Sequence, residues 1–255
     1  MIMKSNTSWG NVAEWYDEML ETSEDSYQKN VILPNVLRIL NIEKGTRILD
    51  LACGQGFFSR AFADAGAQVI GVDASHELIA LAKKYANKKI IYRIAPADKL
   101  DFFADKSFDA AIIILAIQNM KHMANIFSVC SRVLAPSGKL ILVMNHPAFR
   151  IPKRSSWGWD AVHKAQYRRV DGYLTESAVG IDMHPGKEQK ETTISFHRPL
   201  QTYVNALSKN NFAVTRMEEW ISHRQSQKGP RQIAEDRSRK EIPLFLMIEG
   251  RKFAF

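Results

Sequence analysis

One stretch constrains this chain more than any other: Thr46-Arg-Ile-Leu-Asp-Leu-Ala-Cys-Gly-Gln-Gly-Phe57. It predicts a short buried strand over 47–51, then a loop with glycines at Gly54 and Gly56, then a helix that begins near Phe57. Glycine is needed where the backbone takes a positive φ or must touch a ligand. The backbone N–H groups at the N-terminus of such a helix suit a carboxylate or a phosphate. The stretch therefore predicts a site for a nucleotide-like ligand; the alternative is a plain strand–turn–helix of an α/β domain.

The residues after the loop distinguish between two kinds of nucleotide site. The dinucleotide fingerprint G-x-G-x-x-G needs a third glycine, but this chain has Ser59 there, which disfavours a nicotinamide dehydrogenase. The next predicted strand, over 68–73, ends on Asp73, where nucleotide-binding α/β folds place an acid that accepts hydrogen bonds from both ribose hydroxyls. The alternative for Asp73 is a carboxylate that caps the helix predicted over 75–87. The loop and Asp73 together favour a nucleotide-like cofactor.

Predicted strands and helices alternate along the first part of the chain. The run over 110–115 is apolar without alternation, as in a central parallel strand that is buried on both faces. The order predicts a doubly wound parallel sheet with right-handed crossovers. Ligands of such sheets bind beyond the carboxyl ends of the strands. The predicted strands cover 47–51, 68–73, 89–94, 110–115 and 139–144, and the helices between them cover 57–65, 75–87 and 121–134.

The motif D-x-A-C-G-x-G that starts at Asp50 resembles the first motif of class I S-adenosylmethionine-dependent methyltransferases. Asp73, Asp98 and Ser107-Phe-Asp109 follow in the order of the family's later motifs. The resemblance covers 9–145 well and 199–252 loosely, and it is to small-molecule members such as the quinone-biosynthesis methyltransferases. It implies a doubly wound, mostly parallel seven-stranded sheet that ends in an antiparallel hairpin, with an insertion after the fifth strand.

The resemblance also implies S-adenosylmethionine as the cofactor. Trp15-Tyr16-Asp17 resembles an N-terminal segment that covers the cofactor in many members, and Asp98 matches an acid that binds the adenine amino group. The alternative for Asp98 is a turn aspartate. Ala52 stands where many members have glycine, and we expect a mild effect because that position precedes the tightest turn. The residues expected to bind the cofactor are Tyr16, Asp50, Ala52, Gly54, Gly56, Asp73, Ala74, Ala97, Asp98, Leu115 and Gln118.

The length of 255 residues predicts a single domain over 1–255. Within this domain, the segment 7–43 is predicted to form a helical lid over the site; the alternative is that its helices only pack in the core. The segment 146–198 has several prolines and no long period, and it predicts a loop-rich insertion above the carboxyl edge of the sheet, where substrate recognition usually lies. A closing strand pair is predicted over 212–220 and 243–250, and the basic segment 222–241 between them predicts a mobile or substrate-edge loop.

Methyl transfer from a sulfonium is an in-line displacement, so the protein mainly positions the acceptor and excludes water. His146, directly after the fifth predicted strand, is the candidate general base; the alternative is a turn histidine bonded to backbone. Asp182 and His184 fall short of the three converging ligands that a metal needs, so no metal is expected. The candidate substrate-binding residues, which core packing or a solvated face would also explain, are Arg150, Trp157, Trp159 and Tyr167.

Composition leaves the acceptor open. The net charge of +8 and pI near 9.4 permit an anionic small molecule, and also RNA. Amino-group methylases of nucleic acids have an N-P-P-Y/F motif after the fourth strand, and this chain reads Ala116-Ile-Gln-Asn-Met120 there, so a small-molecule acceptor is favoured. A non-catalytic binding module is a further alternative. Two cysteines predict a reducing, cytoplasmic setting, and no apolar run is long enough to predict a membrane span.

Overall fold

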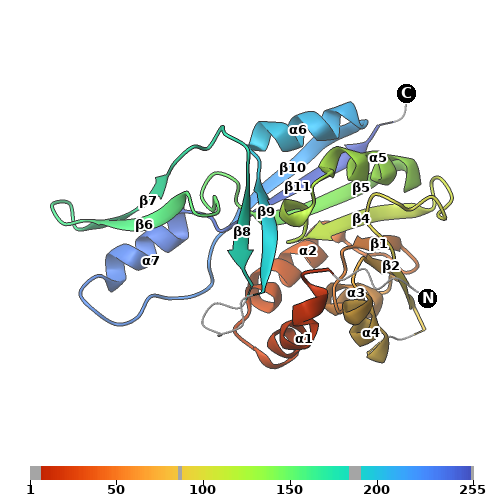
Figure 1. The fold of residues 1–255 in the computed structure, drawn as a ribbon, viewed down its shortest axis with the longest axis horizontal. Coiled ribbons are helices and arrows are strands. Elements are labelled where there is room, and N and C mark those ends of the chain that lie inside the picture. The colour runs from red at the N-terminus through yellow and green to blue at the C-terminus, as the bar shows by residue number, and fades with distance from the viewer. Residues whose placement is uncertain (1–6, 86–87, 184–190, 254–255) are drawn as a thin grey trace.

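The computed structural model describes residues 7–85, 88–183 and 191–253 of the chain. Its centre is a seven-stranded sheet with the order β10-β11-β5-β4-β1-β2-β3, and β1 to β5 pair in parallel (Figure 1). The strands are β1 (Arg47–Leu51), β2 (Gln68–Asp73), β3 (Ile90–Ile94), β4 (Phe108–Ile114), β5 (Leu134–Asn145), β10 (Phe212–Trp220) and β11 (Phe245–Lys252). Strand β11 runs antiparallel to both β5 and β10, which confirms the predicted closing pair and the doubly wound fold class.

Helices cover both faces of this sheet (Figure 1). One face carries α2 (Leu33–Leu40), α3 (Phe57–Asp64) and α4 (His76–Lys84), and the other carries α5 (Met123–Val133) and α6 (Leu200–Lys209). The central strand β4 meets helices on both sides, since its residues from Ala110 to Ile113 are fully buried. This explains the apolar run without alternation, because a parallel strand between two helix layers exposes neither face.

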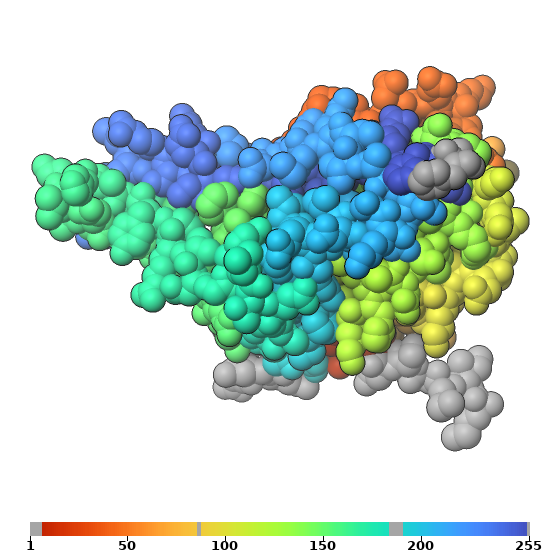
Figure 2. All heavy atoms as spheres, turned by 90° about the horizontal axis from the view of Figure 1, so that it is seen from above, coloured from red at the N-terminus to blue at the C-terminus, as the bar shows by residue number. Residues whose placement is uncertain are grey.

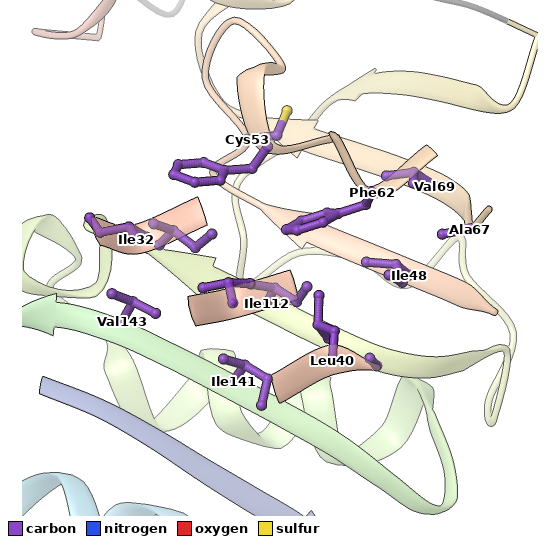
Figure 3. Close-up of a cluster of buried hydrophobic side chains, with 14 of the residues drawn as sticks. Ile32, Leu40, Ile48, Cys53, Phe62, Ala67, Val69, Ile112, Ile141 and Val143 are labelled. Atoms are coloured by element: carbon purple, nitrogen blue, oxygen red, sulfur yellow. The ribbon is translucent and has the colours of Figure 1, made fainter. Parts of the chain in front are cut away.

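Alternate residues of each strand feed two hydrophobic clusters. In β1, Ile48 enters the cluster with α2 and α3, whereas Leu49 enters the cluster with α5. Figure 3 shows the first cluster, in which Phe62 of α3 lies over the sheet near Ile48. Because successive side chains of a strand point to opposite faces, each strand packs against both helix layers of the sheet.

The N-terminal region is broken into several short elements. The 3-10 turn η1 (Gly10–Val12) leads into α1 (Ala13–Thr22), and a π-helical segment η2 (Gln28–Ile32) leads into α2. The segment predicted as helical over 7–43 is therefore helical in several short pieces. Pro34 lies in the first turn of α2, as its missing N–H requires.

The insertion predicted after the fifth strand is present, but the expectation that it is rich in loops is wrong. Two antiparallel hairpins occupy it, β6 (Ser155–Asp160) with β7 (Ala165–Val170), and β8 (Ser177–Asp182) with β9 (Thr192–His197). Most side chains of these two-stranded sheets stay partly or fully exposed, so their sequences carry no clear apolar alternation that would predict strands. His184, which falls between β8 and β9, lies outside the described residues.

Two further boundaries differ from expectation. The second half of the segment 222–241 is a helix, α7 (Gln232–Glu241), which packs on β7 where the Ser238 Oγ donates to the Gln166 carbonyl at 2.8 Å. Its polar sequence has no apolar stripe from which a helix could be recognised. Strand β5 begins at Leu134 rather than at 139, because Leu134 is fully buried and pairs with Phe108 before a register shift.

The hairpin β6–β7 and helix α7 form a lobe at one end of the molecule (Figure 1). Figure 2 shows the green residues of this hairpin and the blue residues of α7 side by side at that end. Among the described residues, no helix is both long enough and apolar enough to cross a bilayer.

The clusters predict where a substitution is costly. Phe62 is fully buried, and Phe62→Ala should lower the free energy of unfolding by about 3–5 kcal/mol because it leaves a cavity between α3 and the sheet. Ile91→Ala, at an edge-strand position that is 53% exposed, is the control and should cost under about 1 kcal/mol. Urea denaturation of both variants measures the difference, and equal losses would contradict this account of the core.

Candidate active site

A cavity of about 340 Å³ lies at the carboxyl ends of β1, β2 and β4 and next to the segment that follows β3. This is the edge at which a doubly wound sheet binds its ligands. Residues from the N-terminal segment close it on another side. The cavity is lined by Thr7, Trp9, Tyr16, Ala52, Gly54, Val72, Asp73, Ala74, Leu78, 95–98, 114–116, 119–122 and Ile126.

The glycine loop after β1 turns through the left-handed region three times, at Ala52 (φ 55°), Gly54 (φ 58°) and Gly56 (φ 84°). A Cβ on Gly56 would lie 2.2 Å from the Tyr92 hydroxyl, so both the φ and the close approach require glycine. Gly54 and Ala52 line the cavity, whereas Gly56 shapes the turn from behind it. The expectation that alanine at 52 is a mild change is wrong, because a left-handed conformation costs a residue with a Cβ about 1–2 kcal/mol.

Asp50 lies beneath the cavity and does not line it. The carboxylate is 2% exposed and accepts a hydrogen bond from the Ser59 Oγ at 2.6 Å. Burial raises the pKa of Asp50 to about 7, and the hydrogen bond from Ser59 opposes this rise. Ser59, which breaks the dinucleotide fingerprint, therefore donates a hydrogen bond to the buried Asp50 carboxyl group. This role was not predicted from the sequence.

Asp73 lies at the end of β2 and lines the cavity. Its Oδ2 accepts from the Gly54 N–H at 2.9 Å and its Oδ1 accepts from the Ser75 N–H at 2.8 Å. Burial raises the pKa of Asp73, and these backbone hydrogen bonds oppose the rise. The helix-cap alternative for Asp73 is wrong, since Ser75 is the N-cap of α4 and accepts from the Leu78 N–H.

Most of the other residues expected at the cofactor also meet at this cavity. Ala74, Ala97, Asp98 and Leu115 line it. Gln118 does not: its Nε2 donates to the Leu115 carbonyl at 2.7 Å, and its side chain lines a neighbouring small hollow with Asn145 and Arg198. Trp9 and the 119–122 turn also form walls of the cavity, and neither was predicted from the sequence. The signal for Trp9 is its aromatic ring in the N-terminal segment that contains Tyr16.

Tyr16 and Trp9 meet edge to face over the cavity, with ring centroids 5.4 Å apart. Burial, and then the charge of Asp73, raise the pKa of Tyr16 to about 12, so the phenol stays protonated at neutral pH. The Tyr16 ring also lies close to Gly54, where a Cβ would come within 3.5 Å of it. The N-terminal segment therefore contacts the glycine loop directly.

His146 lies outside the lining of this cavity and has partners for both ring nitrogens. Its Nδ1 accepts from the Ala148 and Phe149 N–H groups at 3.2 and 3.4 Å, and its Nε2 donates to Glu219 at 2.8 Å. Burial lowers the pKa of His146, and Glu219 opposes this shift, so the neutral ring fits both sets of bonds. The role of His146 as a base stays a prediction, and the geometry favours the alternative of a turn histidine.

The four candidate substrate residues do not form one site. Arg150 and Trp157 line a separate hollow of about 220 Å³. Trp159 lies under the Arg231 guanidinium at 4.6 Å, and Tyr167 is 48% exposed on the outside of the hairpin. Among the described residues, no group of three or more His, Cys, Asp or Glu side chains is placed to hold a metal ion.

The chain is similar to known methyltransferases. A family described as a methyltransferase domain matches residues 49–142. A solved S-adenosylmethionine dependent methyltransferase from Mesorhizobium loti is 30% identical and superposes with a TM-score of 0.69, over 86% of this chain and 96% of that one. The chain therefore belongs to the S-adenosylmethionine-dependent methyltransferases. This confirms the predicted family, and S-adenosylmethionine is its cofactor.

Curated relatives from quinone biosynthesis match the cofactor half of the chain. The demethylmenaquinone methyltransferase of Tropheryma whipplei is 28% identical over 145 residues, which cover 54% of this chain and 58% of the relative. The ubiquinone biosynthesis O-methyltransferase of Xanthomonas oryzae pv. oryzae is 33% identical over 101 residues, which cover 38% of this chain and 42% of the relative. The chain thus spans about half the length of these curated relatives.

The buried carboxyl of Asp50 predicts a pH dependence of stability. Because its folded pKa is raised to about 7, the folded protein holds a proton that the unfolded chain releases, and stability falls as pH rises from about 4 through about 7. Asp50→Asn removes this loss, and between about pH 5 and pH 8 it should gain about 2–3 kcal/mol relative to the native chain, since one pKa unit corresponds to about 1.4 kcal/mol. Chemical denaturation at both pH values measures the gain. Asp101→Asn, at an exposed position, is the control, and parallel pH curves for Asp50→Asn and the native chain would contradict the assignment.

Proposed function

We propose that this protein transfers a methyl group from S-adenosylmethionine to a small-molecule acceptor at the cavity beyond β1, β2 and β4. The observation that carries the proposal is the closure of the glycine loop by Asp73. A buried carboxylate at the next strand end holds the Gly54 N–H and faces the cavity with the loop. The hydrogen bond thus brings together the glycine loop and the acid at the next strand end, which are the two features that a nucleotide-like cofactor requires.

The residues at the cavity fit the cofactor. Gly54 has no side chain there, and one would fill the space that separates the loop from Tyr16. The Asp73 carboxylate accepts the backbone N–H groups of Gly54, Ser75 and Ala74, and its remaining lone-pair capacity would hold the ribose hydroxyls. Asp98 would hold the adenine amino group, and Ala74, Ala97 and Leu115 would form the apolar walls.

The sulfonium supplies an activated methyl group, so the chain's own task is to orient the acceptor and exclude water. We assign this covering role to Trp9 and Tyr16, within the helical segment 7–43. Their rings close the cavity and offer aromatic faces to a positive charge. The neutral Tyr16 phenol also remains a hydrogen-bond donor at neutral pH.

The curated relatives support a small-molecule acceptor rather than a nucleic acid. Two of them are named a demethylmenaquinone methyltransferase and a ubiquinone biosynthesis O-methyltransferase, and we propose a small-molecule acceptor for this chain. Cys53 and Cys130 are both free and buried, which supports a reducing, cytoplasmic setting for the reaction.

The cofactor assignment has a direct test. Calorimetry should show binding of S-adenosylhomocysteine and no binding of NAD. Asp73→Ala should weaken S-adenosylhomocysteine binding by about ten-fold or more, because charge-assisted hydrogen bonds are lost. Asp73→Asn tests the charge with the shape kept, and Asp101→Ala, at an exposed position, should leave the affinity unchanged. Unchanged affinity in Asp73→Ala would refute the ribose assignment.

We propose that His146 organises the turn after β5 rather than acting as a base. His146→Ala should then lower the free energy of unfolding by about 1–3 kcal/mol, because two backbone N–H groups lose their acceptor. Its affinity for S-adenosylhomocysteine should stay unchanged. His163→Ala, where the side chain is 77% exposed, is the control. A variant of native stability that fails to turn over an acceptor identified with labelled cofactor would restore the role as base.

A further inference from the structure

A second hollow, of about 220 Å³, lies where three distant parts of the chain meet. We call it the arginine pocket. Its walls come from the segment after β5 and from the lobe formed by β6–β7 and α7. Its lining residues are Tyr27, Phe149, Arg150, Trp157, Arg168, Arg239 and 242–244.

Three guanidinium groups line the arginine pocket and none of its lining residues is acidic. Arg168 donates to the Phe149 carbonyl at 2.7 Å and to the Ser155 Oγ at 2.8 Å, and Arg239 donates to the Ser226 Oγ at 2.8 Å. All three acceptors are neutral oxygens. Burial, and the nearby charge of Arg168, lower the pKa of Arg150. Among the ion pairs of the described residues, none involves these three arginines.

Unlike Arg168, its neighbour Arg169 on β7 has a carboxylate partner. Arg169 points to the other face of the hairpin and pairs with Asp171 at 2.7 Å. Asp236, which accepts from the Ser226 N–H, interacts with Arg239 from outside the lining of the pocket. Within the pocket no carboxylate separates the cations, so they repel one another and lose hydration. An anion in the pocket would offset both costs, and a guanidinium binds carboxylate or phosphate oxygens in pairs.

The other walls of the arginine pocket are aromatic or apolar. Tyr27, Phe149 and Trp157 contribute rings, and Pro243 and Leu244 contribute aliphatic surface. Arg168 lies over the Trp157 ring at 5.2 Å, which keeps its guanidinium against an aromatic face. A pocket with such walls and such charge suits a small flat ring that carries an acid group.

The arginine pocket lies along the same sheet edge as the cofactor cavity. Arg150 also lines the small hollow that contains Gln118, and Gln118 is bonded to Leu115 of the cofactor cavity. Within that hollow, the buried Gln118 Oε1 and Arg198 Nη1 have no hydrogen-bond partner. Polar atoms without a hydrogen-bond partner therefore lie in the small hollow between the cofactor cavity and the arginine pocket.

We propose that the arginine pocket binds the acid group of the methyl acceptor, and that the acceptor is an aromatic carboxylate or phosphate. This proposal rests on the proposed methyltransferase function, because the pocket by itself indicates only that an anion binds there. Arg150, Arg168 and Arg239 hold the acid group, and Trp157 and Tyr27 flank the ring. The other end of the acceptor is then directed along the sheet edge toward the cofactor cavity.

The test is calorimetric titration of the full chain, saturated with S-adenosylhomocysteine, with benzoate, phenyl phosphate and uncharged benzamide. Both anions, or the one that matches the natural acid group, should bind, and benzamide should not. Arg168→Gln should weaken anion binding by about ten-fold or more, and Arg168→Lys should restore part of it. Arg169→Gln, the neighbour on the opposite face, is the matched control and should bind as the native chain does.

Two sets of outcomes would overturn the proposal. It fails if neither anion binds, if benzamide binds as well as benzoate, or if Arg168→Gln and Arg169→Gln behave alike. It also fails if the methylated product formed from a metabolite extract with labelled cofactor is not retained by an anion exchanger at neutral pH. Binding of S-adenosylhomocysteine, measured on the same samples, separates this failure from failure of the methyltransferase proposal, and it also shows that each variant is folded.

Discussion

The carboxyl edge of the sheet depends on the hydrogen bond from the Gly54 N–H to the Asp73 carboxylate. It ties the loop after β1 to the end of β2, and the Cys53 N–H adds a second tie to the Val72 carbonyl at 3.1 Å. The parallel pairing of β1 with β2 sets both strand ends at one level, so that the loop and the acid can meet. The left-handed residues of the loop then hold the backbone open toward the cavity.

Charge is distributed unevenly along this edge. Asp73 and Asp98 line the cofactor cavity together with one cation, Lys121, whereas the arginine pocket is lined by three cations and no acid. The two sets lie over different strands, and so they do not neutralise each other. In a partly dehydrated edge such charges act strongly. The arrangement matches a positively charged methyl donor at one end and the proposed anionic acceptor at the other.

Much of the sheet and of the cofactor cavity could be predicted from the sequence, because each depends on local patterns. The buried strand β4, the glycine loop and Asp73 are each recognisable within a few residues. The two hairpins and α7 could not be predicted in the same way, because they are small and largely exposed, and so they carry no apolar period. The cost of Ala52 was also hidden, since a backbone φ is set by the path of the whole loop.

By itself, the sequence determined the fold class, and its motifs indicated the family through their resemblance to known methyltransferases. The fold class follows from the order of the predicted elements and from apolar periodicity, which act over short distances along the chain. That fold class predicts a cofactor at the carboxyl ends of the strands. Only the tertiary structure decided that Ser59 serves Asp50, that both nitrogens of His146 are occupied, and that Arg150, Arg168 and Arg239 share one pocket. Each of these depends on side chains that meet through packing between distant segments, and no spacing along the chain records such a meeting.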